Sequence, residues 1–207
     1  GINYMSNLNA ESKKRGVITA STGNHGQSIA YSASVFGVPA VIVSPEGANT
    51  SKVEPMQNLG AELILKGKNF DEARETVESE SAKRGLTSIH AANEPLLIAG
   101  VATYTLEILE DIPDVDVIIV PIGGGSSASA ACIAAKTINP KIQIIGVQSS
   151  QAPAAYYSWN SREIKSAPTN TAAEGLATSV GFELTQRILW EYLDDFTLVD
   201  DKEIEDS

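Results

Sequence analysis

The chain has 207 residues, of which 43% are hydrophobic and 20% are charged, a composition typical of a soluble globular protein with a proper core. Its formal net charge of −11 argues against nucleic-acid binding, because a phosphate backbone requires a basic surface. No apolar run approaches the length that a membrane span needs. The single cysteine, Cys132, excludes an internal disulfide and fits a reducing cytoplasm, where we expect the protein to be found.

Short segments rich in Val and Ile alternate with helical patterns along the chain. Strands are predicted at Val17–Ala20, Ala40–Val43, Glu62–Leu65, Thr87–His90, Asp116–Pro121, Gln143–Gln148 and Phe196–Val199. Their near-continuous hydrophobicity is typical of parallel strands that are buried on both faces. We therefore expect an α/β fold of open, mostly parallel sheets with helices on both faces, and ligands at the carboxyl ends of the strands.

Two helices between these strands have clear sequence signals. Asn69 can cap a helix over Phe70–Arg84, which Gly85 can end. A second helix is predicted from Glu94 to about Glu110, with four apolar side chains on one face: Leu97, Val101, Tyr104 and Ile108.

The first candidate ligand loop is the run Ser21-Thr22-Gly23-Asn24-His25-Gly26-Gln27, between the first strand and an amphipathic helix. Small polar residues at this place can hold an anion on backbone N–H groups. An ordinary capped turn would explain Ser, Thr and Asn equally well. It would not explain His25 and Gln27 in the first helical turn, where acids are usual.

The second candidate loop, Gly123-Gly124-Gly125-Ser126-Ser127, also follows a strand and opens a helix. It is a poor dinucleotide fingerprint, since Ala128 stands in place of the third Gly and the next strand ends in Gln148 rather than an acid. A monophosphate cradle is a better interpretation, and a plain strand-to-helix turn is the alternative. Two anion-holding loops suggest a ligand with a phosphate at one end and a carboxylate at the other.

No spacing of Cys, His or carboxylates resembles a metal site, so we expect no bound metal. Cys132 falls on the apolar stripe of an Ala-rich helix, where we expect a buried and unreactive thiol.

The whole chain resembles the fold-type II pyridoxal-phosphate enzymes (the tryptophan synthase β-like fold), in particular the threonine/serine dehydratases and the serine racemases. The resemblance is carried by the two loops, by Ala173-Glu174-Gly175-Leu176, and by Ala99-Gly100 with Thr103 and Glu107. It implies two domains, with residues 1–95 in a small domain that binds the substrate carboxylate and residues 96–207 in a large domain that binds pyridoxal phosphate. It also implies a small amino-acid substrate and a homo-oligomer, a dimer or a tetramer.

The resemblance assigns roles to individual residues. The cofactor phosphate would lie on Gly123, Gly124, Gly125, Ser126 and Ser127. Asn24 would bond the ring hydroxyl of the cofactor, and Gly175 would lie against its ring. The substrate carboxylate would be held by Ser21, Thr22, Gly23, His25 and Gln27, with Ser179 as a further candidate.

The Lys that carries the cofactor as a Schiff base in this family lies in a short motif ending in Arg-Gly and a small residue. Gly1 aligns with the end of that motif, so this Lys is expected just upstream of Gly1. Lys13, Lys14 and Lys52 stand at the wrong positions and are interpreted as solvated surface charges.

Family members also continue beyond the position of Ser207, which lies in a helix predicted to begin near Asp201. The chain is therefore expected to be a central fragment of a longer enzyme, and inactive by itself. Truncation of this kind is expected to leave apolar surface uncovered.

The implied reaction is deamination of threonine or serine to a 2-oxo acid and ammonia in the full-length parent. Thr22 stands where racemases carry a Ser that acts as a base, so a racemase or another β-eliminating or β-replacing enzyme of this fold is the alternative. A non-catalytic ligand-binding remnant, and a nicotinamide-dependent protein, are further hypotheses from other classes.

Overall fold

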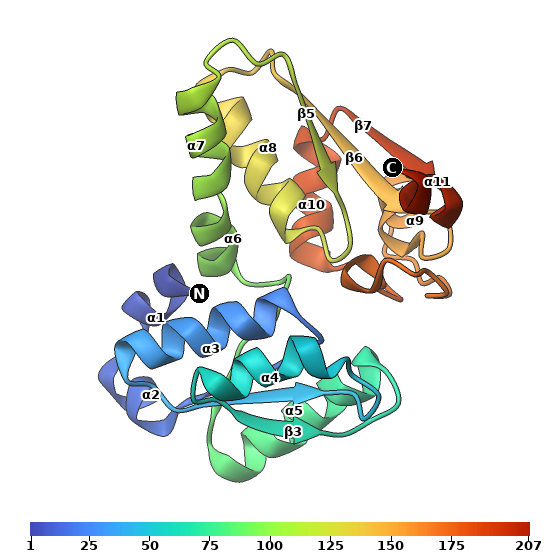
Figure 1. Ribbon diagram of the computed structural model, residues 1–207. Helices are drawn as coiled ribbons and strands as arrows, with labels where there is room; N and C mark the ends of the chain where they lie inside the picture. Colours follow the sequence, from blue (N-terminus) through green and yellow to red (C-terminus); the bar gives the residue numbers. More distant parts are fainter. The chain divides into compact units, whose positions relative to one another are not determined.

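The computed structural model describes residues 1–207, apart from the side chain of Asp71. The chain divides into two compact units, Gly1–Ala91 and Ala92–Ser207 (Figure 1). Each unit is built on its own parallel sheet. In the described part of the chain, no helix combines the length and the apolar character that crossing a membrane requires.

The first unit contains a four-stranded sheet in the order β3-β2-β1-β4. Its strands are β1 (Val17–Ala20), β2 (Ala40–Ser44), β3 (Glu62–Leu65) and β4 (Thr87–Ser88). Its helices are α1 (Ile2–Asn7), α2 (Ala10–Arg15), α3 (Asn24–Phe36), α4 (Thr50–Asn58) and α5 (Phe70–Arg84). The two central strands, β1 and β2, are buried along their whole length, as their continuous hydrophobicity predicts.

Helices cover both faces of this first sheet. Ile18 and Val41 share a buried cluster with Ala73 and Val77 of α5. Side chains alternate along a strand, so Thr19 points to the opposite face, where Figure 1 shows α3.

The predicted ends of α5 are confirmed. The side-chain oxygen of Asn69 accepts a hydrogen bond from the backbone N–H of Glu72 over 3.0 Å. Gly85 ends the helix with a φ of 67°, in the left-handed region that favours glycine.

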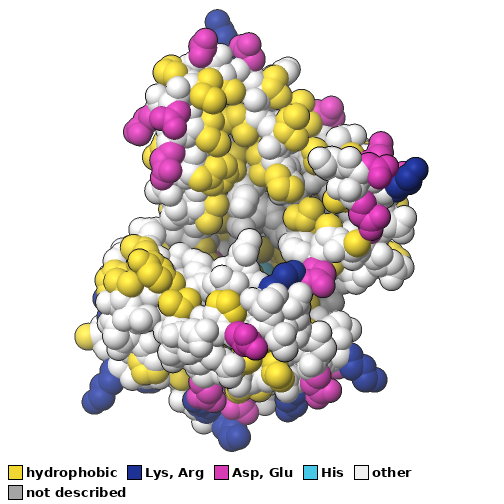
Figure 2. All heavy atoms as spheres, viewed as in Figure 1, with side chains coloured by type: hydrophobic (Ala, Val, Ile, Leu, Met, Phe, Trp, Pro, Cys, Tyr) yellow, Lys and Arg dark blue, Asp and Glu magenta, His cyan; other side chains and the backbone are white. Residues whose placement is uncertain are grey.

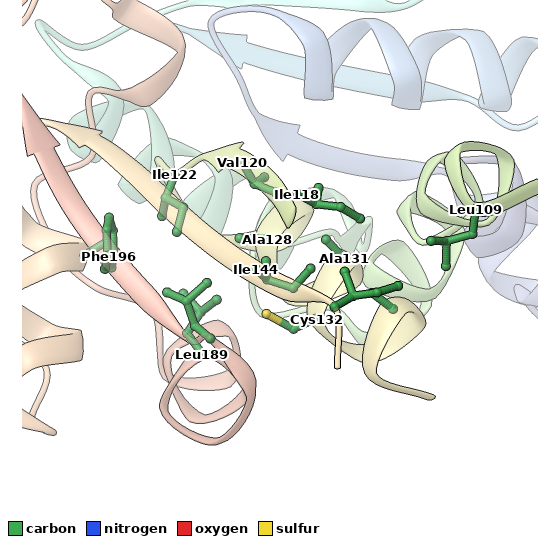
Figure 3. Close-up of a cluster of buried hydrophobic side chains, with 14 residues drawn as sticks. Leu109, Ile118, Val120, Ile122, Ala128, Ala131, Cys132, Ile144, Leu189 and Phe196 are labelled. Carbon is green, nitrogen blue, oxygen red and sulfur yellow. The ribbon is translucent and has the colours of Figure 1, made fainter. Parts of the chain in front are cut away.

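The second unit contains a three-stranded parallel sheet in the order β5-β6-β7. Its strands are β5 (Val117–Pro121), β6 (Gln143–Ser149) and β7 (Asp195–Val199). Its helices are α6 (Pro95–Val101), α7 (Thr103–Asp111), α8 (Ser126–Ile138), α9 (Ala154–Ser161), the short 3-10 helix η1 (Glu174–Leu176), α10 (Glu183–Tyr192) and α11 (Asp201–Asp206). The core lies between the sheet and the helices α8 and α10, where Ile118, Ile144, Leu189 and Phe196 pack together (Figure 3). Cys132 is buried in this core, as predicted.

One expectation for the second sheet is wrong. The outer strand β5 alternates between exposed and buried positions, and Val117 and Ile119 are 39% and 65% exposed. Successive side chains of a strand point to opposite faces of the sheet. Ile118 and Val120, which pair with Ile144 and Gly146, therefore face the core, whereas Val117 and Ile119 face away from it. Figure 2 shows hydrophobic side chains reaching the surface over α7 and β5. Apolar surface is therefore exposed on this unit.

The single helix expected over Glu94–Glu110 is two helices, α6 and α7, separated at Ala102. The hydroxyl of Thr103 donates to the carbonyl oxygen of Gly100 over 3.0 Å, a local bond that competes with the helical ladder and favours a bend. Leu97 is buried as expected, and Tyr104 and Ile108 are partly buried and pack against the core of the second unit.

Candidate functional site

In the first loop, the Ser21 side chain shapes the start of α3. Its Oγ accepts hydrogen bonds from the N–H groups of Gly23 and Gly26, over 3.1 and 2.8 Å. A Cβ at Gly26 would lie 2.7 Å from the sulfur of Met56, so a larger residue at this turn would require the flexible Met56 side chain to move. Ser21 is buried. Its hydroxyl is thus engaged within the loop rather than presented to a ligand.

The backbone of the same loop presents donors that the fold leaves without a partner. Within the described residues, the N–H groups of Thr22, Asn24 and His25 make no intramolecular hydrogen bond, and neither do the side chains of Thr22 and Asn24. Asn24 is exposed at the first position of α3. Unpaired N–H groups at a helix start attract an anion, because the helix dipole places partial positive charge there.

The side chain of Gln27, another residue expected to hold the carboxylate, lies against α4. Its amide nitrogen is 3.4 Å from the carbonyl oxygen of Lys52, a weak hydrogen bond. Gly23 is the N-cap residue of α3, and its carbonyl oxygen accepts a hydrogen bond from the N–H of Gln27 over 3.2 Å.

The side chain of His25 contacts Thr19, a residue for which the sequence predicted no role. Its Nε2 lies 2.8 Å from the hydroxyl oxygen of Thr19, and that oxygen lies 2.7 Å from the carbonyl oxygen of Ile89. Burial lowers the pKa of His25 to about 4, and His90 contributes in the same direction. The imidazole is therefore neutral at pH 7.

The second loop, Gly123–Gly125, joins the sheet to α8 as predicted. Gly125 has a φ of 88°, which a residue with a Cβ adopts only with strain. Among the residues that the structure describes, none of the N–H groups from Gly123 to Ser127 has an intramolecular partner. The hydroxyls of Ser126 and Ser127 are likewise without one.

Thr185 of α10 fixes the shape of this glycine loop. Its hydroxyl donates to the carbonyl oxygen of Gly124 over 2.8 Å. A Cβ at Gly125 would lie 3.1 Å from the Thr185 side chain. Thr185 is fully buried, so this contact is part of the core as well as of the loop.

The segment around Gly175 lies directly on the glycine loop. A Cβ at Gly123 would be 2.9 Å from the Cα of Leu176 and 3.1 Å from the carbonyl oxygen of Gly175. Gly175 itself is exposed, with open space where a Cβ would be. The glycine loop and the segment around Gly175, which were both expected to bind the cofactor, therefore contact each other within the second unit. Ser179 lies further along this segment, and its carbonyl oxygen accepts from the N–H of Ala167 over 2.9 Å.

Asp201 of α11 anchors the start of that segment. Its carboxylate accepts hydrogen bonds from the hydroxyls of Ser149 and Thr171, over 2.6 and 2.8 Å, and from the N–H of Ala172 over 2.6 Å. No local sequence pattern indicates this role, because the partners lie 29 to 52 residues away along the chain.

Comparison with known proteins decides the family. The sequence profile described as pyridoxal-phosphate dependent enzyme matches residues 1–206. The chain belongs to this family. The cofactor of the family is pyridoxal phosphate, as the resemblance implied.

Two curated relatives are similar over almost the whole chain. The L-threonine ammonia-lyase of Thermotoga maritima is 40% identical over 208 residues, covering 99% of this chain and 51% of that protein. The catabolic L-threonine dehydratase of Staphylococcus aureus is 39% identical over 204 residues, covering 98% of this chain and 59% of that protein. The chain thus spans between half and three fifths of the length of these relatives.

Solved structures show the same fold. Maize serine racemase superposes with a TM-score of 0.93 at 35% identity, over 99% of this chain and 62% of that one. The processed form of threonine deaminase isoform 2 from Solanum lycopersicum gives a TM-score of 0.90 at 34% identity, over 96% and 58%. The expected fold-type II architecture is confirmed.

The residues present fit a cofactor that carries a phosphate. The unpaired N–H groups from Gly123 to Ser127 and the two serine hydroxyls form a neutral cradle of hydrogen-bond donors, which suits a phosphate group. Side chains at Gly123 or Gly125 would collide with their neighbours, so the backbone itself forms the surface there. In the described part of the chain, no three His, Cys, Asp or Glu residues gather as metal ligands would.

Proposed function

We propose that the protein of which this chain is part is a pyridoxal-phosphate-dependent ammonia-lyase acting on a hydroxyamino acid. The observation that carries the proposal is the identity of about 40% to an L-threonine ammonia-lyase along the whole chain. The reaction converts L-threonine to 2-oxobutanoate and ammonia, or L-serine to pyruvate and ammonia. When bound, the cofactor withdraws electrons from the α-carbon of the amino acid.

The second unit would hold the cofactor. Its phosphate would accept hydrogen bonds from the N–H groups of Gly123–Ser127, which the contact between Thr185 and Gly124 keeps in a fixed curve. Gly175 would leave room for the flat cofactor ring, because no side chain projects from it.

The first unit would hold the substrate. The N–H groups of Thr22, Asn24 and His25 would bind its carboxylate, and the exposed Asn24 amide would bond the ring hydroxyl of the cofactor. Closure of such a loop over substrate would exclude water from the reacting atoms. The roles of Gly23, Gln27 and Ser179 in carboxylate binding are part of the same proposal, whereas Ser21 would act indirectly, because its Oγ holds the N–H groups of Gly23 and Gly26.

Racemisation is the second candidate, and two observations favour it. A serine racemase is among the structures most similar in backbone, and the Thr22 hydroxyl has no partner within the described residues. A hydroxyl at this place could remove or return a proton at the α-carbon. The β-branch of Thr22 restricts its χ1 rotation, which would make it less adaptable than a Ser.

The deciding experiment supplies the purified natural protein with L-threonine or L-serine and pyridoxal phosphate, and follows 2-oxo acid and enantiomer together. Production of 2-oxo acid and ammonia in equal amounts supports the lyase. Epimer without 2-oxo acid identifies a racemase. Neither product from any hydroxyamino acid would overturn both candidates and favour a ligand-binding remnant.

A matched pair of variants ties the activity to the first loop. Asn24→Ala removes the exposed amide, and Thr137→Ala removes a surface hydroxyl of α8 that only bonds the carbonyl oxygen of Ile133. We expect the first variant to lose most of its activity and the second to keep it.

Two further features of the whole protein are proposals. A homo-oligomer is supported by the exposed apolar side chains of the second unit, such as Ile119. A cytoplasmic location is supported by the single buried cysteine. Sizing of the natural protein and fractionation of its cells test them.

A further inference from the structure

Two short contacts of the Thr19 hydroxyl oxygen determine where the proton beside His25 lies. The Thr19 hydroxyl oxygen is 2.7 Å from the carbonyl oxygen of Ile89, closer than two oxygens approach without a hydrogen between them. A carbonyl oxygen has no hydrogen to give, so the Thr19 hydroxyl must be the donor.

The hydrogen between Thr19 and His25 must then come from the imidazole. The Thr19 oxygen has already directed its only hydrogen to Ile89, and it lies 2.8 Å from Nε2 of His25. Nε2 therefore carries the hydrogen and donates it to Thr19. In a neutral imidazole the other nitrogen, Nδ1, then has a lone pair and no hydrogen.

This tautomer changes what the His25 side chain can do for an anion. A lone pair on Nδ1 repels a carboxylate, and only a second proton would turn Nδ1 into a donor. Burial disfavours that proton, since the pKa of His25 lies at about 4.

We infer that His25 is a positioning residue: its Nε2–H, held by Thr19 and Ile89, fixes the first turn of α3 on β1. The carboxylate is bound there by backbone N–H groups and not by the imidazole. The part concerning the carboxylate rests on the proposed function, whereas the tautomer and its anchoring role do not.

The chain suits a direct test, because His25 and His90 are its only two histidines. Two-bond nitrogen–proton NMR correlations distinguish the two neutral tautomers, and a His90→Gln variant assigns the signals. We expect His25 as the Nε2–H tautomer at pH 7, and a loss of that preference in Thr19→Val but not in Thr19→Ser. An Nδ1–H tautomer, or an imidazolium at pH 7, overturns the inference whether or not the protein is a lyase.

Two substitutions at His25 separate positioning from carboxylate binding. The amide of Gln can reach the place of Nε2, whereas the amide of Asn lies near the place of Nδ1. We expect His25→Gln in the natural protein to keep KM near its original value, and His25→Asn to raise KM about tenfold with a smaller change in kcat. Rescue by Asn rather than by Gln would show that Nδ1 binds the carboxylate, and would overturn the inference.

A failure of the proposed function can be distinguished from a failure of the inference about His25. If the natural protein makes no 2-oxo acid, the NMR result still decides the tautomer, and thermal unfolding still compares the variants. Anchoring by His25 then predicts that His25→Asn melts below His25→Gln. Equal melting of the two variants would contradict it.

Discussion

The hydroxyl of Thr185 donates a hydrogen bond to the carbonyl oxygen of Gly124 over 2.8 Å, between residues 61 positions apart in the sequence. The same hydroxyl lies 3.2 Å from the carbonyl oxygen of Phe182 in its own helix. Because the Thr185 side chain also packs against Gly125, α10 determines the curve of the glycine loop. The conformation of the glycine loop therefore depends on the packing of α10 as well as on the loop's own glycines.

Substitution of Thr185 by Val tests this relationship. Val has nearly the same shape but no hydroxyl, so the partly buried carbonyl oxygen of Gly124 loses its donor, at a cost of about 1 kcal/mol in the free energy of unfolding. We expect weaker binding of pyridoxal phosphate as well, because the loop backbone relaxes. Denaturant unfolding and titration with the cofactor measure the two effects. Thr185→Ser, which keeps the hydroxyl, serves as control, and equal cofactor affinity in both variants would show that the bond does not shape the loop.

Two glycines with the same backbone angle give a second prediction. Gly125 and Gly60 both have a φ of 88°, but a Cβ at Gly60 meets nothing within 4 Å, whereas one at Gly125 lies 3.1 Å from Thr185. Alanine at either place costs about 1–2 kcal/mol of stability through backbone strain. We expect only Gly125→Ala to weaken cofactor binding in addition. A similar cofactor affinity in the two variants, measured by the visible absorption of the bound cofactor, would contradict a phosphate site on the loop.

The sequence sufficed for the features that local patterns encode. Runs of apolar residues marked the central strands β1 and β2, because these parallel strands are buried on both faces. All seven strands lie where they were predicted, but the strand expected over Thr87–His90 is only Thr87–Ser88. Glycine and small polar residues marked both candidate loops, because a position such as Gly125 has a left-handed backbone that favours glycine.

The residues that support the loops could not be found in this way. Each of Thr19, Thr185 and Asp201 makes a hydrogen bond to a residue between 29 and 70 positions away. A hydroxyl or a carboxylate at such positions has no periodic signal, and its role depends on which distant segments the fold brings together. The bend at Ala102 was missed for a different reason, since apolar periodicity does not distinguish one helix from two helices in succession.

The Cys132 thiol gives a third prediction. Burial raises the pKa of this thiol to about 12, and the nearby Asp194 carboxylate adds to the shift. The reactive thiolate is therefore scarce at pH 8, and reagent access is blocked by the core. A disulfide reagent such as dithiobis(nitrobenzoate) is expected to label the folded chain only as fast as it unfolds. Because Cys132 is the only cysteine in the sequence, one absorbance trace measures its reaction. Rapid labelling in the absence of denaturant would show that the core opens locally around α8.

The last prediction concerns acid. Hydrogen bonds from Ser149, from the Ala172 N–H and from Thr171 hold the pKa of Asp201 below its ordinary value. A carboxyl group with a lowered pKa in the folded state stabilises the fold above its unfolded pKa, and this contribution disappears as the pH falls through the folded pKa. Protonation would release the segment that begins at Thr171 and carries Gly175.

We therefore expect the free energy of unfolding to fall below about pH 4, and to fall less steeply in Asp201→Asn, which has no charge to lose. Asp206→Asn, at the other end of α11, is the control and is expected to keep the original pH profile. If Asp201→Asn showed the same acid dependence as Asp206→Asn, the carboxylate would not be the anchor of this segment.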